Sequence, residues 1–278
     1  MTESTDVVTT EETPTALVPP SAYGELAGVG LEGGDAGEIA MPFIQILQGL
    51  SPVVQDPSRP DAVAGKLYNS VTGDVYNDIY FVPCHRDHTF VEWKPRNQGG
   101  GGGAGFVAVH QPGADIVVDA ITAQRYKVKD GRKTRTLLTA DGNELVETRT
   151  FSGLLVDSDT PTEAVLPVVI PFTSGKIAQF RGAMTAIRTV KGRPPLFANV
   201  LHFQTTLKKY PDGDSFVYNI RLLKDKQLPA PAADGTMHPV LSEALALSKM
   251  IQAGQATADH ASQTTADNTA DGDDSSHF

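Results

Sequence analysis

The sequence has very little cysteine and no long apolar run. Its 278 residues include a single cysteine, Cys84, which excludes an intrachain disulfide framework and predicts a reducing cytoplasm as the compartment. No apolar stretch approaches the ~20 residues that a membrane-spanning helix needs, so no membrane partner is expected. The first thirteen residues, MTESTDVVTTEET, lack the basic start and the apolar block of a signal peptide.

Lysine and arginine are missing from both ends of the chain. Residues 1–40 hold eight acids and residues 250–278 hold five, with no Lys or Arg in either segment. The 23 bases all lie from Arg59 to Lys249, together with the 20 acids that remain of 33. The chain has a net charge of −10, but this body has a net charge of +3. A basic body between acidic tails is compatible with a polyanionic partner.

Composition also divides the chain into three parts. Both ends contain few large apolar side chains and cannot bury enough surface to fold alone. We therefore expect a disordered acidic segment at 1–40, a folded domain at 41–251, and a disordered acidic tail at 252–278.

Short runs of strand-forming residues separated by turn signals dominate the body. The expected strands are Lys66–Val71, Val75–Val82, His88–Lys94, Phe106–His110, Ile116–Asp119, Arg125–Lys129, Lys133–Leu138, Glu144–Val156, Val165–Ile170, Phe197–Leu207 and Phe216–Leu223. Apolar residues at three-to-four spacing predict two helices, from Thr173 or Ser174 to about Val190 and from Pro239 to Ala253. The pattern predicts a mainly β (α+β) fold, an OB-like antiparallel barrel with additional hairpins and two helices.

Two basic segments are candidates for contact with phosphates. Residues 125–135 hold six bases and one acid around an Asp-Gly turn, and a basic hairpin suits a phosphate backbone because binding releases condensed counterions. A solvated hairpin tip would have the same composition. Between Glu163 and Asp212 there are seven bases and no acid. Stabilisation of a helix C-terminus would explain Lys191 and Arg193, but not the whole stretch.

Aromatic side chains beside these bases are candidates for stacking on nucleobases. Phe90 lies on the polar side of its strand by alternation, Trp93 fits a core position better, and Tyr126 and Tyr210 adjoin bases. The predicted single-stranded DNA site comprises Phe90, Trp93, Lys94, Arg96, Arg125, Tyr126, Lys127, Lys129, Lys133, Arg135, Arg181, Arg188, Lys191, Arg193, Lys208 and Tyr210.

No catalytic motif accompanies these residues. The glycine run at 99–103 lacks the Gly-Lys-Ser/Thr ending of a phosphate loop, and Cys84, His85 and His88 make a poor zinc pattern without a second ligand pair. Walker, nucleophile-elbow and His-Glu-x-x-His patterns are missing. The sequence therefore predicts a protein that is not an enzyme and that uses neither a metal nor a cofactor.

The chain ends in DGDDSSHF, an acidic tip that closes on an aromatic residue. With the basic body and the polar linker, this ending resembles single-stranded DNA-binding proteins of bacteria and phages. In those families the body is an OB-fold, and the acidic tail docks on replication and repair enzymes. The resemblance implies partner docking through Asp271, Asp273, Asp274 and Phe278. The tip differs in one respect, since His277 stands where bacterial relatives carry proline.

A second resemblance covers roughly residues 41–225. The segments MPFIQILQGLSPVV, GKLYNSVTGDVY, IYFVPCHRDHTFVEWKPR and PFTSGKIAQFRGAM are similar to phage proteins of early replication and recombination modules. The resemblance implies a sequence-tolerant single-stranded DNA-binding protein that acts in the bacterial host cytoplasm. Both a monomer and a homo-oligomer are compatible with the sequence. Two alternatives remain open: a recombination protein that anneals single strands, and a structural protein of the virion.

Overall fold

The computed structural model describes residues 40–95, 105–129, 131–210 and 213–258. The strands are β1 (Ala40–Met41), β2 (Ile44–Ile46), β3 (Leu67–Asn69), β4 (Val75–Tyr76), β5 (Ile79–Trp93), β6 (Phe106–His110), β7 (Tyr126–Lys129), β8 (Arg132–Leu138), β9 (Glu144–Val156), β10 (Ala164–Thr173), β11 (Leu201–Tyr210), β12 (Gly213–Leu222) and β13 (Thr257–Ala258). The helices are α1 (Pro52–Gln55), α2 (Asp115–Thr122), α3 (Ile177–Arg188) and α4 (Pro239–Gln252), with 3₁₀ turns at Ser174–Lys176 and Leu196–Ala198. None of these helices is long and apolar enough to cross a membrane.

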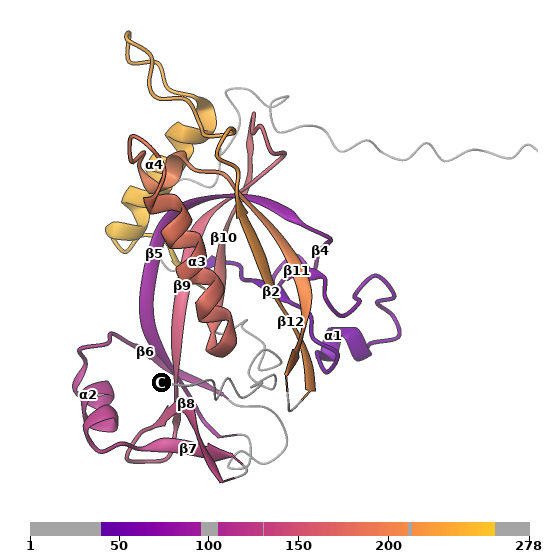
Figure 1. Ribbon diagram of the computed structural model, residues 1–278, viewed down its shortest axis with the longest axis vertical. Coiled ribbons are helices and arrows are strands. Elements are labelled where there is room, and N and C mark those ends of the chain that lie inside the picture. Colours follow the sequence, from indigo (N-terminus) through magenta and orange to yellow (C-terminus); the bar gives the residue numbers. More distant parts are fainter. Residues whose placement is uncertain (1–39, 96–104, 130, 211–212, 259–278) are drawn as a thin grey trace, which may run out of the picture. The chain divides into compact units, whose positions relative to one another are not determined.

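One large antiparallel sheet organises the fold (Figure 1). Its strand order is β12-β11-β5-β9-β8-β7, with β10 added beside β9 and β6 beside β5. The long strands β5 and β9 pair from Tyr80–Val156 to Trp93–Glu144 and so connect both ends of the sheet. The mainly β, α+β class predicted from the sequence is confirmed.

The described strands do not close into a barrel. The segment 43–48, which contains β2, contacts both β10 and β12, but among the described strands β2 pairs only with β3. On one side there is a single parallel bridge, Phe43 to Val169. On the other side, Gln48 holds both backbone groups of Phe216, with its Nε2 donating to the Phe216 carbonyl and its Oε1 accepting from the Phe216 N–H, each at 2.9 Å. A side chain thus satisfies the edge of β12 where a barrel would need another strand, and the expected OB-like barrel is not seen in this part of the chain.

Three helices cover separate apolar surfaces of the sheet. Phe180 and Ile187 of α3 are buried in the core that contains Phe151 and Phe172. Helix α4 belongs to a second core, through residues that include Leu241. Helix α2 belongs to a third, smaller core at the end of the sheet that carries β6, β7 and β8. The face of α3 that the first core leaves uncovered forms the main part of the site described below.

Several expected elements differ in the structure. Ile116–Asp119 was expected as a strand from its branched residues but belongs to α2, because Val117 and Ala120 lie one turn apart and are both fully buried. The expected strands Val75–Val82 and His88–Lys94 are largely joined in β5, which passes Pro83 with a register shift. The two predicted helices and the hairpin β7–β8 are confirmed.

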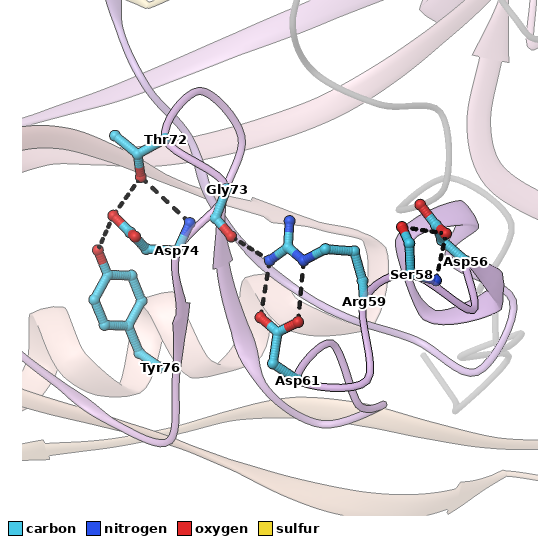
Figure 2. A network of polar contacts seen from close by, with 8 residues as sticks. All are labelled: Asp56, Ser58, Arg59, Asp61, Thr72, Gly73, Asp74 and Tyr76. Carbon is cyan, nitrogen blue, oxygen red and sulfur yellow. Dashed lines mark hydrogen bonds and ion pairs between the residues drawn. The ribbon is translucent and has the colours of Figure 1, made fainter. Parts of the chain in front are cut away.

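A polar network fixes the loop between β2 and β3 against the β3–β4 turn (Figure 2). Arg59 pairs with Asp61 at 2.9 Å, and the same guanidinium donates to the Gly73 carbonyl at 2.6 Å. Asp74 accepts from the Thr72 hydroxyl at 2.6 Å. Arg59 lowers the pKa of Asp61 by hydrogen bonding to the carboxylate. The contacts are local to these loops, so we assign them to the fold rather than to a ligand site.

Candidate nucleic-acid interface

The basic hairpin β7–β8 uses much of its charge inside the protein. Arg125 forms an ion pair with Asp119, and its Nε donates to the Leu138 carbonyl at 3.3 Å. Lys127 pairs with Glu144 at 2.7 Å. These contacts neutralise two of the expected phosphate ligands and make the hairpin a weaker candidate than its composition indicates.

Three further candidates of the hairpin, Lys133, Tyr126 and Arg135, have contacts of their own. Lys133 is exposed, with its Nζ 5.5 Å from the centre of the Tyr126 ring. Tyr126 itself is half-buried and packs against the third core. Arg135 is exposed but has an interaction of its own, and the side chain of Lys129 lies outside the described residues.

Two of the expected stacking residues are buried. Phe90 is 7% exposed and packs in the third core with Leu145. Trp93 is 4% exposed, with its ring edge-on to Phe106 at 5.9 Å between centroids. A nucleobase needs an open ring face, so we remove both from the candidate site. Lys94 is exposed at the end of β5, and Arg96 lies outside the described residues.

Helix α3 carries the most available positive charge. Its residues Phe180 and Ile187 enter the core, whereas Arg181 and Arg188 are exposed. These two arginines are seven residues apart and therefore point in nearly the same direction. Neither side chain has an ion pair or hydrogen bond with any described residue. Both cations are therefore available to a ligand.

The turn after α3 extends this charge. Lys191 and Arg193 are exposed, and their side chains likewise have no partner within the described part of the chain. Gly192 and Arg193 have φ of 83° and 47°, both in the left-handed region, and the Arg193 N–H donates to the Val190 carbonyl at 3.1 Å. We define the α3 basic surface as Arg181, Arg188, Lys191 and Arg193.

A hollow of about 430 Å³ lies at this end of the helix, lined by Ile187, Arg188, Arg193 and Pro194. The sequence pattern predicts the two arginines as phosphate ligands but does not indicate the hollow. The signal in the sequence was Lys191-Gly192-Arg193-Pro194-Pro195, in which a glycine directly after a helix indicates a left-handed turn that redirects the chain.

The hairpin β11–β12 brings two further candidates to the other end of α3. Gly175 lies in the turn directly before α3, and the hydroxyl of Tyr210 is 3.2 Å from the point where a Cβ on this glycine would stand. The Nζ of Lys208 lies 4.7 Å from the centre of the Tyr210 ring. Tyr210 thus positions Lys208 and has one ring face occupied. With twelve residues in α3, the two ends are about 18 Å apart at 1.5 Å per residue.

Elsewhere the described residues show little reactive chemistry. No group of three or more His, Cys, Asp or Glu residues in the described ranges is arranged to hold a metal ion. Burial raises the pKa of the Cys84 thiol to about 12, so this cysteine is protonated at neutral pH and is a poor nucleophile.

The ends of the chain bear on two further expectations. The partner-docking residues Asp271, Asp273, Asp274 and Phe278 lie outside the described residues, as do residues 1–39. Inside the described part, Ala40–Met41 pairs in parallel with Thr257–Ala258, and Ala256 is buried. Three residues that the composition placed in the two tails, Ala40, Thr257 and Ala258, therefore take part in strand pairing.

Comparison with known proteins gives one match. The family model described as Pam3 phage gp34-like protein matches residues 11–257. No match was found among curated proteins or among solved structures. The match supports the resemblance to phage proteins that the sequence motifs indicated. It spans most of the chain, and the protein therefore belongs to the Pam3 phage gp34-like protein family.

Proposed function

We propose that this protein binds single-stranded DNA through the α3 basic surface. The observation that carries the proposal is the set of four exposed cations, Arg181, Arg188, Lys191 and Arg193, none of which has a partner among the described residues. Lys208, which lies over the Tyr210 ring, is a further candidate near the other end of the helix.

Unpaired cations that gather on one surface repel each other and are readily neutralised by a polyanion. Each phosphate that they neutralise releases counterions, which is the main source of affinity in binding that does not depend on sequence. The contrast with β7–β8 supports the choice of α3, because Arg125 and Lys127 are already paired with acids. Their phosphate contacts would first require those pairs to break.

The preference for single strands rests on the resemblance of the sequence motifs to phage single-stranded DNA-binding proteins. The match to a phage protein family is compatible with that role. The α3 basic surface is narrow, because it spans a single helix of twelve residues and the turn that follows. A flexible single strand can bend to follow such a helix.

A pair of matched double variants tests the proposal. Arg181→Ala/Arg188→Ala removes two charges from the α3 basic surface, and Lys224→Ala/Lys249→Ala removes two exposed charges from elsewhere. Titration of a labelled oligothymidine, followed by fluorescence anisotropy, should show about tenfold weaker binding for the first variant. The second variant should bind within about twofold of the wild type, because its lysines make no phosphate contact.

Circular dichroism should show the same fold for both variants, since all four side chains are exposed. Equal losses of affinity in the two variants would mean that only the total charge matters. That result would contradict a site on α3.

A further inference from the structure

The hollow at the end of α3 combines charge with apolar surface. Arg188 comes from the last turn of the helix and Arg193 from the turn beyond it. The half-buried Pro194 supplies an apolar wall, while Ile187, which also lines the hollow, is only 6% exposed because it packs in the first core. The hollow's volume of about 430 Å³ lies within the range of pockets that hold small molecules.

The backbone at Arg193 is unfavourable for arginine. Its φ of 47° is left-handed, a conformation that glycine and asparagine adopt at lower cost. Arg193 also precedes Pro194, and a proline restricts the residue before it to extended conformations. Backbone strain of this kind is concentrated at functional sites. Arginine at this position is therefore better explained by what its side chain binds than by the turn it occupies.

We propose that this hollow holds one nucleotide of the bound strand, with its phosphate between Arg188 and Arg193 and its base against Pro194. Guanidinium groups fit phosphate oxygens in a bidentate geometry that lysine does not offer. A purely ionic contact would not need the apolar wall. This assignment rests on the proposed function and adds to it a defined subsite for a phosphate and a base.

Substitution of Arg193 separates folding from binding. Glycine and asparagine both suit a left-handed φ, so Arg193→Gly and Arg193→Asn should melt at or above the wild-type temperature. Both should nevertheless bind thymidine monophosphate about tenfold more weakly in a titration followed by NMR or calorimetry, because one charged phosphate contact is lost. Arg188→Gln removes the other contact from a regular helical position and should have the same effect.

Inorganic phosphate serves as the second probe. The wild type should bind thymidine monophosphate at least several-fold more tightly than phosphate, because only the nucleotide can use Pro194. Equal affinities for the two probes would overturn the base contact. Wild-type affinity for the nucleotide in Arg193→Gly or in Arg188→Gln would overturn the subsite.

These outcomes are distinguishable from failure of the proposed function. If Arg181→Ala/Arg188→Ala weakens oligothymidine binding while the wild type shows no affinity for the mononucleotide, the surface is supported and the subsite is wrong. If the mononucleotide binds and depends on Arg193 while oligothymidine does not bind, the proposed function is wrong and the hollow is a nucleotide site of another kind.

Discussion

The salt dependence of DNA binding gives the most quantitative prediction. Each phosphate contact to a single strand contributes about −0.7 to the slope of log affinity against log salt. Four contacts from the α3 basic surface therefore give a slope of about −2.8, or a roughly fiftyfold loss between about 0.05 M and 0.2 M salt. Removing Arg181 and Arg188 should reduce the magnitude of the slope by about 1.4, which leaves a loss of about sevenfold from this surface.

The assay is anisotropy titration of oligothymidine at four or five salt concentrations for three proteins. The wild type and Lys224→Ala/Lys249→Ala should give parallel lines, and Arg181→Ala/Arg188→Ala a shallower one. Any contact that Lys208 adds is common to all three proteins and does not affect the difference. If the α3 variant has lower affinity but an unchanged slope, the two arginines do not contact phosphates and the reasoning fails.

Three further predictions concern the fold and its titratable groups. Gly153→Ala should lower the free energy of unfolding by about 3 kcal/mol or more in thermal melts, since its Cβ would stand 2.1 Å from the Val82 carbonyl oxygen. The control Gly182→Ala, at an open helical position, should raise the free energy of unfolding by about 1 kcal/mol. Similar results for both variants would contradict the packing around Gly153. Cys84 should react with a thiol reagent only as fast as the protein opens, because its pKa is about 12 in the buried site; immediate labelling of native protein would show that the site is open. Burial lowers the pKa of His88 from its ordinary 6.5, with Arg149 adding to the effect. The unfolded chain therefore takes up the proton first, and stability should fall as pH drops through 6.5. His88→Gln should flatten this decline in pH-dependent melts, and an unchanged pH profile would refute the assignment to His88.

The sequence predicted those helices and hairpins that depend on turn residues or on apolar spacing within one segment. The turn at Asp130-Gly131 marked the hairpin β7–β8, and apolar spacing marked α3 and α4. The same reasoning missed α2, because the branched run Ile116–Val118 favours a strand and only packing of Val117 in the third core selects the helix.

Which residues belong to the candidate site depends more on contacts between residues that are far apart in the sequence. Lys127 and Glu144 are 17 residues apart, so composition could not show that the charge of the hairpin is already paired. Alternation placed Phe90 on a polar strand face beside Glu92, but Glu92 is itself buried and accepts from His110 and Asn143 at 2.7 Å. That face therefore points into the protein. The stretch without acids between Glu163 and Asp212, by contrast, contains the α3 cations that have no partner among the described residues, although Lys176 in the same stretch is buried and has an interaction.

The central claim is that the α3 basic surface serves a single-stranded polynucleotide. The most direct measurement is a competition in which unlabelled single strands and duplexes of the same length displace labelled oligothymidine from the wild-type protein at about 0.15 M salt. We predict that the single strand displaces the probe at a concentration at least tenfold lower than the duplex does. Displacement by the duplex at an equal or lower concentration, or no binding of oligothymidine even at about 0.05 M salt, would contradict the claim.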